Sequence, residues 1–146
     1  MSQPKQKFHV NYSKNAVYTD SLNSTAKDGQ RSYIEYRDLG LSEATGGKFH
    51  AHVGRVKPEF AGEKHTRPHR HHVDFQMIYV LKGWTKMVYE GQEGVFTFRA
   101  GDMYFQPAGI VHDGLESSED FEALEIFSPA VHETEEVEGV PGHDDE

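Results

Sequence analysis

The chain has 146 residues, of which 36% are hydrophobic, and this size suits one domain with one buried core. The formal net charge is -9, but the final segment HETEEVEGVPGHDDE carries seven of the 24 acidic residues and no Lys or Arg, so the rest is nearly neutral. A nearly neutral body weighs against the clustered basic face that nucleic acids require. The chain has no cysteine, so histidine, carboxylate, amide or water would have to hold any metal ion.

The ends of the chain differ in composition from its middle. No apolar run approaches the roughly 20 residues of a membrane span, and the start MSQPKQKFHVNYSKN lacks the apolar segment of a secretory signal. We therefore expect a cytoplasmic protein without membrane contact. Residues 1–30 read as a polar N-terminal arm, residues 31–130 as the folded domain, and residues 131–146 as an acidic tail that we expect to be disordered.

From residue 33 onward the pattern is typical of an all-β domain. Short runs rich in β-branched and aromatic residues are separated by Gly, Pro and Asp, and none shows a sustained period of 3.6 residues. Eight such runs in one small domain predict a β-sandwich or β-barrel. The expected strands are 32–39, 48–56, 75–83, 84–90, 94–100, 102–107, a short one at 111–115, and 121–127.

The stretch PHRHHVDFQMIYVLKG, residues 68–83, combines three histidines with a β-prone run. His69 and His71 are two residues apart, so on an extended segment both side chains lie on one face and can share one ion, whereas His72 points the other way. If Gln76 faces inward, Ile78 faces inward with it, which places a polar group at the mouth of an apolar interior. A solvated histidine-rich loop is the alternative interpretation of this segment.

A second segment, GDMYFQPAGIVH, has the spacing G-x5-P-x-G-x2-H. Together the two segments strongly resemble the motifs of the cupin superfamily, G-x5-H-x-H-x3,4-E-x6-G and G-x5-P-x-G-x2-H-x3-N. They cover residues 68–116, about a third of the chain. The motif positions are filled here by His69, His71, Gln76, Gly83, Gly101, Pro107, Gly109 and His112.

This resemblance implies a cupin-type jelly-roll β-barrel over residues 31–130, with His69, His71, Gln76 and His112 around one divalent ion. Three positions depart from the family pattern: Gly62 lies one residue too far from His69, Gln76 replaces the usual Glu, and Glu116 replaces the usual Asn. The three histidines alone are the alternative ligand set, with Gln76 beside them.

Replacement of a carboxylate by an amide removes a negative charge from the metal. This change should make the ion a stronger Lewis acid and lower the pKa of bound water. A nitrogen-rich set suits nickel, zinc, cobalt or copper better than magnesium or calcium. We therefore expect one divalent transition metal from the set nickel, zinc, iron, cobalt, manganese and copper.

The segment FEALEIFSPA supplies a candidate catalytic residue. Glu125 and Phe127 share one face of the last expected strand, and if that face is the interior, Glu125 is a general acid or base and Phe127 contacts the substrate. The pattern acid-x-Phe-x-Pro resembles that of small cupins of uronate degradation, which open and tautomerise unsaturated sugar acids. Those proteins carry an arginine shortly after the proline, whereas Ala130, Val131 and His132 follow it here, so the resemblance does not extend to a uronate substrate.

Two further residues are candidates for substrate contact. His52 shares a face with His50 in KFHAHVGRV, and that face either lines the interior or lies on the solvated or dimer surface. Glu116 shares the alternation of His112 and is expected to line the same cavity. The resemblance and the residues together favour a metalloenzyme that catalyses an isomerisation, tautomerisation or elimination of a small oxygen-rich organic molecule. A metal-dependent dioxygenase and a non-catalytic binding protein are the alternatives.

The strand at 75–83 is apolar on both faces. Phe75, Met77 and Tyr79 form an outward stripe beside the inward one, and such strands pack against something on each side. We expect a homodimer formed through this sheet, which is also usual in the family that the chain resembles.

Overall fold

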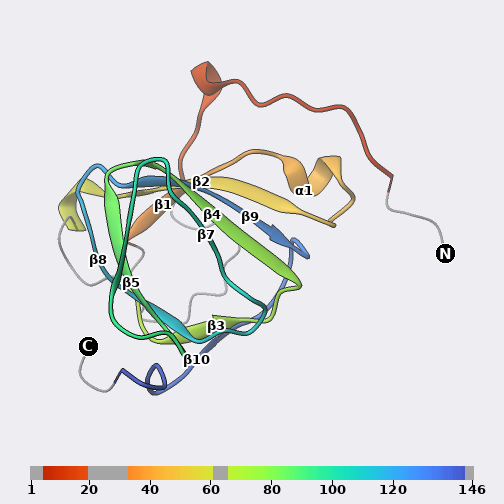
Figure 1. Cartoon of the computed structure of the whole chain (residues 1–146). Coiled ribbons are helices and arrows are strands. Elements are labelled where there is room, and N and C mark those ends of the chain that lie inside the picture. The colour runs from red at the N-terminus through yellow and green to blue at the C-terminus, as the bar shows by residue number, and fades with distance from the viewer. Residues whose placement is uncertain (1–4, 20–32, 61–65, 144–146) are drawn as a thin grey trace.

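The computed structural model describes residues 5–19, 33–60 and 66–143, and it contains two five-stranded antiparallel sheets (Figure 1). Sheet A comprises β1 (Ile34–Asp38), β2 (His50–Val56), β9 (Glu122–Ser128), β4 (Phe75–Lys82) and β7 (Met103–Phe105), in that order. Sheet B comprises β10 (Thr134–Glu136), β3 (His69–His71), β8 (His112–Ser117), β5 (Trp84–Tyr89) and β6 (Phe96–Arg99). Three short helical segments accompany them: η1 (Ser13–Asn15), α1 (Leu41–Ala44) and η2 (Pro58–Phe60).

All eight expected strands are present, and the all-β jelly-roll prediction is confirmed. The chain crosses repeatedly between the two sheets, so that neighbours in a sheet come from distant parts of the sequence. Among the described strands the two sheets do not join by hydrogen bonds into one closed barrel. The structure adds β3, which carries two of the histidines, and β10.

The interior follows the side-chain alternation of the central strands. On β4, Gln76, Ile78 and Val80 are buried, whereas Tyr79 and Leu81 are exposed, as the alternation predicts. Residues of β2, β4 and β9 in sheet A, together with the residue before β9, form a buried apolar cluster. Its buried members are Val56, Ile78, Val80, Phe121 and Ala123.

Gly83 allows the chain to turn from β4 in sheet A to β5 in sheet B. Its φ of +68° lies in the left-handed region that glycine adopts without strain. A Cβ atom at this position would also lie 2.2 Å from Oγ of Ser118 and 3.0 Å from Cα of Phe121. The glycine that ends the first motif therefore permits a close approach between the β4–β5 turn and the connection from β8 to β9.

The acidic end of the chain differs from our expectation of disorder. Residues 134–136 form β10, which pairs with β3 so that Thr134 lies opposite His71. Val140 is buried with Val88 and Val111, and Val137 packs against the same cluster. The high acidic content led to the expectation of disorder. These valines nevertheless anchor the segment, while the carboxylates face outward. Residues 144–146 lie outside the described part of the chain.

The N-terminal arm contacts the rest of the domain at a few points between residues 5 and 19. The Lys7 backbone amide donates to the Ala44 carbonyl, the His9 ring nitrogen Nε2 lies 2.8 Å from the Leu39 carbonyl oxygen, and Thr19 forms an isolated bridge with Tyr36 of β1. Figure 1 shows this segment extending past α1, away from the two sheets. Within the described residues, no helix has the length and apolar character needed to cross a membrane.

Candidate metal centre and cavity

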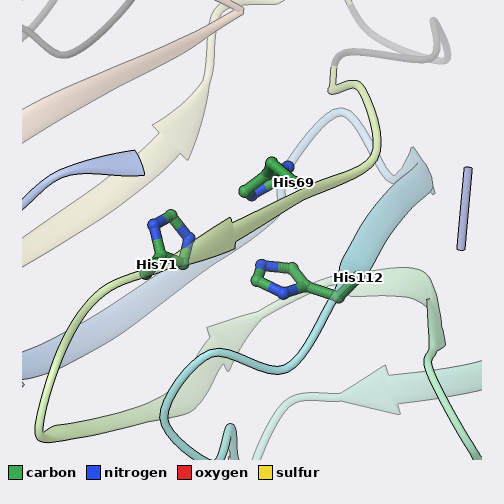
Figure 2. Close-up of side chains that lie close together, drawn as sticks. All are labelled: His69, His71 and His112. Atoms are coloured by element: carbon green, nitrogen blue, oxygen red, sulfur yellow. The ribbon is translucent and has the colours of Figure 1, made fainter. Parts of the chain in front are cut away.

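Three histidine side chains from two neighbouring strands point toward one another (Figure 2). His69 and His71 belong to β3, His112 begins β8, and His69 pairs directly with His112 across the two strands. The potential ligand nitrogens of the three rings all lie within 4.8 Å of one another. Imidazole nitrogens at this separation can share one metal ion.

Hydrogen bonds leave the Nε2 atom of each ring available for a metal. Nδ1 of His69 donates to the Arg67 carbonyl, and Nδ1 of His112 donates to the Ile110 carbonyl over 2.9 Å. Because a carbonyl only accepts, the proton of each neutral ring must lie on Nδ1. Nδ1 of His71 lies 2.8 Å from the Thr134 hydroxyl, which can donate or accept, so this contact orients the third ring without fixing its tautomer. Histidines that bind metals commonly use one nitrogen for the ion and the other for such a partner.

The environment also keeps the rings of His71 and His112 uncharged. Burial, and then the neighbouring His112 and His69, lower the pKa of His71 to about 2. Burial, followed by His69, lowers the pKa of His112 to about 4. Neutral imidazole is the form that binds a metal ion, so the donor set fits a divalent transition metal.

The three histidines open into a cavity of about 220 Å³ between the two sheets. Its other polar residues include His52, Gln76 and Glu125 of sheet A. Away from the histidines the wall is largely apolar and aromatic. That part is formed by Ile34, Tyr36, Ile78, Met87, Tyr104, Phe121 and Ala123.

Glu125 is the acidic residue that lines the cavity. Its Oε1 atom accepts a hydrogen bond from His52 Nε2 over 2.7 Å, and its Oε2 atom accepts one from Gln76 Nε2. Burial raises the pKa of Glu125, but the hydrogen bonds from His52 and Gln76 oppose it, and the pKa is lowered to about 2. Glu125 is therefore a carboxylate at neutral pH.

Gln76 is buried in β4 on the same face as the cavity. Its amide nitrogen donates to Glu125, so the oxygen Oε1 is the atom that it can offer to an ion. The amide thus holds the candidate acid–base residue and lines the same cavity as the three histidines.

Comparison with known proteins agrees with this architecture. The family model of the cupin domain matches residues 59–127, the stretch that contains both histidine segments. The fold also resembles that of an RmlC-like cupin from Shewanella frigidimarina NCIMB 400, with 20% sequence identity, a TM-score of 0.56, and coverage of 86% of this chain and 95% of that one. Residues 59–127 therefore form a cupin domain.

Two further solved structures are similar to this cupin in fold. The polyketide cyclase RemF from Streptomyces resistomycificus is 17% identical, with a TM-score of 0.67 and coverage of 90% of this chain and 86% of that one. A sugar phosphate isomerase of the cupin superfamily from Silicibacter pomeroyi DSS-3 is 16% identical, with a TM-score of 0.61 and coverage of 79% and 72%. No curated protein has significant sequence similarity to the chain.

Glu116 does not lie where the alternation of β8 placed it. The pairing of β5 with β8 jumps from Lys86 opposite Glu116 to Met87 opposite Gly114, so Leu115 is an extra residue at a bulge. The bulge reverses the alternation beyond it and turns the Glu116 side chain outward, where it is 45% exposed and lies 3.9 Å from the Lys86 ammonium. The expectation that Glu116 lines this cupin's cavity is corrected accordingly.

The other two expected substrate contacts have different positions. His52 lines the cavity, so the histidine face of β2 is the inner one. Phe127 is buried but does not line the cavity; it lies beneath His50 and His52, with ring centroids 4.8 Å and 5.8 Å away. Its place in this cupin is therefore that of a support for the histidines.

Sequence reasoning missed several residues around the site. Thr134 holds His71 from a segment that we expected to be disordered, so no signal pointed to it. Tyr104 and Gln106 also line the cavity, and their alternation on and after β7 was the available signal. Tyr36 of β1 lines the cavity and packs on His52 with a centroid distance of 4.5 Å.

Proposed function

We propose that this cupin is a metalloenzyme in which His69, His71 and His112 bind one divalent transition metal. The observation that carries the proposal is the convergence of three imidazole rings, whose potential ligand nitrogens lie within 4.8 Å of one another, in a cavity that also holds an ionised carboxylate. Gln76 would complete the ligand set through Oε1. Nickel, zinc, cobalt and copper suit this set best, and iron and manganese are further members of the class.

The proposed reaction is an isomerisation, tautomerisation or elimination on a small organic molecule. A bound divalent ion would polarise a carbonyl or hydroxyl oxygen of that molecule. Glu125 would then accept a proton from the neighbouring substrate atom and return it, while His52 and Gln76 hold the carboxylate in place. Fold neighbours named as a polyketide cyclase and a sugar phosphate isomerase support this class of chemistry.

The cavity wall supports a substrate with an apolar body and an oxygen-bearing end. Ile78, Met87 and Phe121 would contact the apolar part, away from the histidines. Burial, and to a smaller extent the charge of Glu125, raise the pKa values of Tyr36 and Tyr104, so both phenols keep their protons and can donate hydrogen bonds. A volume of about 220 Å³ restricts the substrate to a small molecule.

The metal site can be tested without knowledge of the substrate. Protein purified without added metal should contain, or take up, one nickel, zinc or iron ion per chain, as measured by elemental mass spectrometry. Each of His69→Ala, His71→Ala and His112→Ala should lose that ion. His72→Ala is the matched control, because His72 contacts Glu135 at the surface and should leave the metal content unchanged. A protein that takes up none of these metals would overturn the proposal.

The same three imidazoles also suit iron, nickel or copper in an oxygen-dependent dioxygenase, which is our second candidate. Such an enzyme would consume oxygen with a phenolic or diketone substrate, whereas the proposed isomerase or lyase would work equally well under nitrogen. Turnover measured with an oxygen electrode, and repeated anaerobically, separates the two. A non-catalytic binder would bind the same ligands and show turnover under neither condition.

A further inference from the structure

Two neighbouring inner-face histidines of β2 form a second cluster, outside the candidate metal ligands. His50 and His52 are 3% and 7% exposed. The pairing of β2 with β9 places His50 opposite Phe127 and His52 opposite Glu125. Fully buried imidazoles need hydrogen-bond partners, so the contacts of these two rings are informative.

The two rings form a hydrogen-bonded chain that ends at the candidate acid–base residue. His50 Nε2 lies 2.9 Å from His52 Nδ1, and His52 Nε2 lies 2.7 Å from Glu125 Oε1. The other oxygen of the same carboxylate accepts from Gln76. Both oxygens of Glu125 are thereby held, one from β2 and one from β4.

Aromatic rings fix the planes of the two imidazoles. Phe127 stacks on His50 with a centroid distance of 4.8 Å and an interplanar angle of 29°. Tyr36, on β1, packs on His52 with a centroid distance of 4.5 Å. The imidazole nitrogens are therefore aimed along the chain by packing as well as by hydrogen bonding.

If each imidazole ring carries one proton, the donors and acceptors along the row of hydrogen bonds from His50 to Glu125 can be arranged in only one way. The Glu125 carboxylate only accepts, so His52 must carry its proton on Nε2, and its Nδ1 is then an acceptor. His50 must in turn carry its proton on Nε2 in order to donate to that atom. Burial, followed by the neighbouring His52, lowers the pKa of His50, which favours the neutral ring.

We infer that His50 and His52 are positioning residues for Glu125: His50 fixes the tautomer of His52, and His52 holds the carboxylate toward the cavity. The inference rests on the proposed function for the catalytic role of Glu125. It also gives Phe127 a role, since this ring supports His50. If His52 instead donated from Nδ1 to His50, its Nε2 lone pair would point at the carboxylate, and Glu125 would lose this hydrogen bond.

Two variants of His50 separate hydrogen bonding from packing. His50→Phe keeps a ring that can stack on Phe127 but has no N–H, whereas His50→Gln loses the ring but keeps an amide N–H that can reach His52 Nδ1. The readout is the nitrogen-15 NMR spectrum of the histidine side chains in zinc-treated protein, with signals assigned by single-histidine substitution. Wild type should show His52 as the Nε2–H tautomer with an unprotonated, hydrogen-bonded Nδ1.

The two variants should then respond in opposite ways. His50→Phe should lose the single His52 tautomer and show exchange between both forms, and His50→Gln should retain it. A packing role alone predicts the reverse order. A protonated Nδ1 on His52 of the wild type, or an unchanged His52 spectrum in His50→Phe, would overturn the inference. Zinc content measured on the same samples reports separately on the proposed function, because neither His50 nor His52 is a proposed metal ligand.

Discussion

Gln76 stands where the cupin motif carries a glutamate, and an amide differs from a carboxylate in having an N–H group to donate. The amide nitrogen donates to Glu125, which leaves Oε1 for an ion. A glutamate in this place would have no proton to donate and would bring a second negative charge beside Glu125. The amide thus suits an ionised carboxylate beside it, and a metal ion bound at the proposed site would keep its full charge for the substrate.

This arrangement makes the Gln76→Glu variant informative. We expect zinc to bind about tenfold more tightly, because an anionic ligand replaces a neutral one, while turnover falls because the ion becomes a weaker Lewis acid. Gln76→Leu, which removes the ligand and the hydrogen bond together, should bind zinc more weakly than wild type. Competition with a chromogenic chelator measures both affinities. Equal affinity in wild type and Gln76→Glu would show that residue 76 does not contact the ion.

At the scale of elements, β10 joins the C-terminal segment to the candidate metal centre. Its pairing with β3 places Thr134 opposite His71, and the threonine hydroxyl holds Nδ1 of that histidine. Partners of this kind orient metal-binding imidazoles and raise their affinity. A strand of three residues therefore contributes to the site without supplying a ligand.

Thr134→Val tests this contribution. The substitution keeps the shape of the side chain and removes the hydroxyl, so zinc affinity should fall by about tenfold with little change in stability. Glu135→Gln on the same strand is the control, because its side chain is exposed and contacts only the peripheral His72 among the described ion pairs. An equal zinc affinity in the two variants and wild type would leave β10 without a role at the site.

The docking of the C-terminal segment also has a measurable free energy. Val140 is 2% exposed and packs with Val88 and Val111, so Val140→Ala should lower the free energy of unfolding by roughly 2 kcal/mol. Val131→Ala, at a side chain that is 80% exposed in the same segment, should change it little. Urea unfolding followed by tryptophan fluorescence compares them. If the tail were disordered, neither substitution would matter.

For the molecule as a whole, the sequence predicted what local alternation and motif spacing determine. The strand order of the chain and the convergence of His69, His71 and His112 are features of this kind. The inner face of β2 could not be predicted in this way. Ala51 and Val53 on its outer face are as buried as His50 and His52 on its inner face. When both faces of a strand are covered, alternation alone does not identify the inner one.

Two further features depended on tertiary contacts that no short window of sequence contains. The bulge at Leu115 turns Glu116 outward, and it arises from the register between β5 and β8. The order of the C-terminal segment depends on Val140 meeting Val88 and Val111, which are distant in the chain. Charge counting gave the opposite expectation because it weighs the exposed carboxylates and ignores which few side chains find a surface to pack on.

Apolar side chains remain exposed on the outer face of sheet A and on the N-terminal arm. On β4 and β7, Tyr79 lies opposite Met103, and Phe105 beside them is 53% exposed. On the arm, Phe8 is 95% exposed although the neighbouring His9 bonds to the body of the protein. Surfaces of this kind on one molecule are typical of protein interfaces. They support our proposal of a homodimer formed through sheet A.

Light scattering coupled to size-exclusion chromatography tests this proposal at micromolar concentration. Wild type should elute with the mass of two chains, and Phe105→Glu should reduce that mass to one chain, because a buried, unpaired carboxylate opposes association. Val95→Glu is the matched control: Val95 is equally exposed, 55% against 53%, but it precedes β6 in sheet B, so its substitution should leave the dimer intact. A monomeric wild type would contradict the proposal, and dissociation by Val95→Glu instead of Phe105→Glu would move the interface to the other sheet.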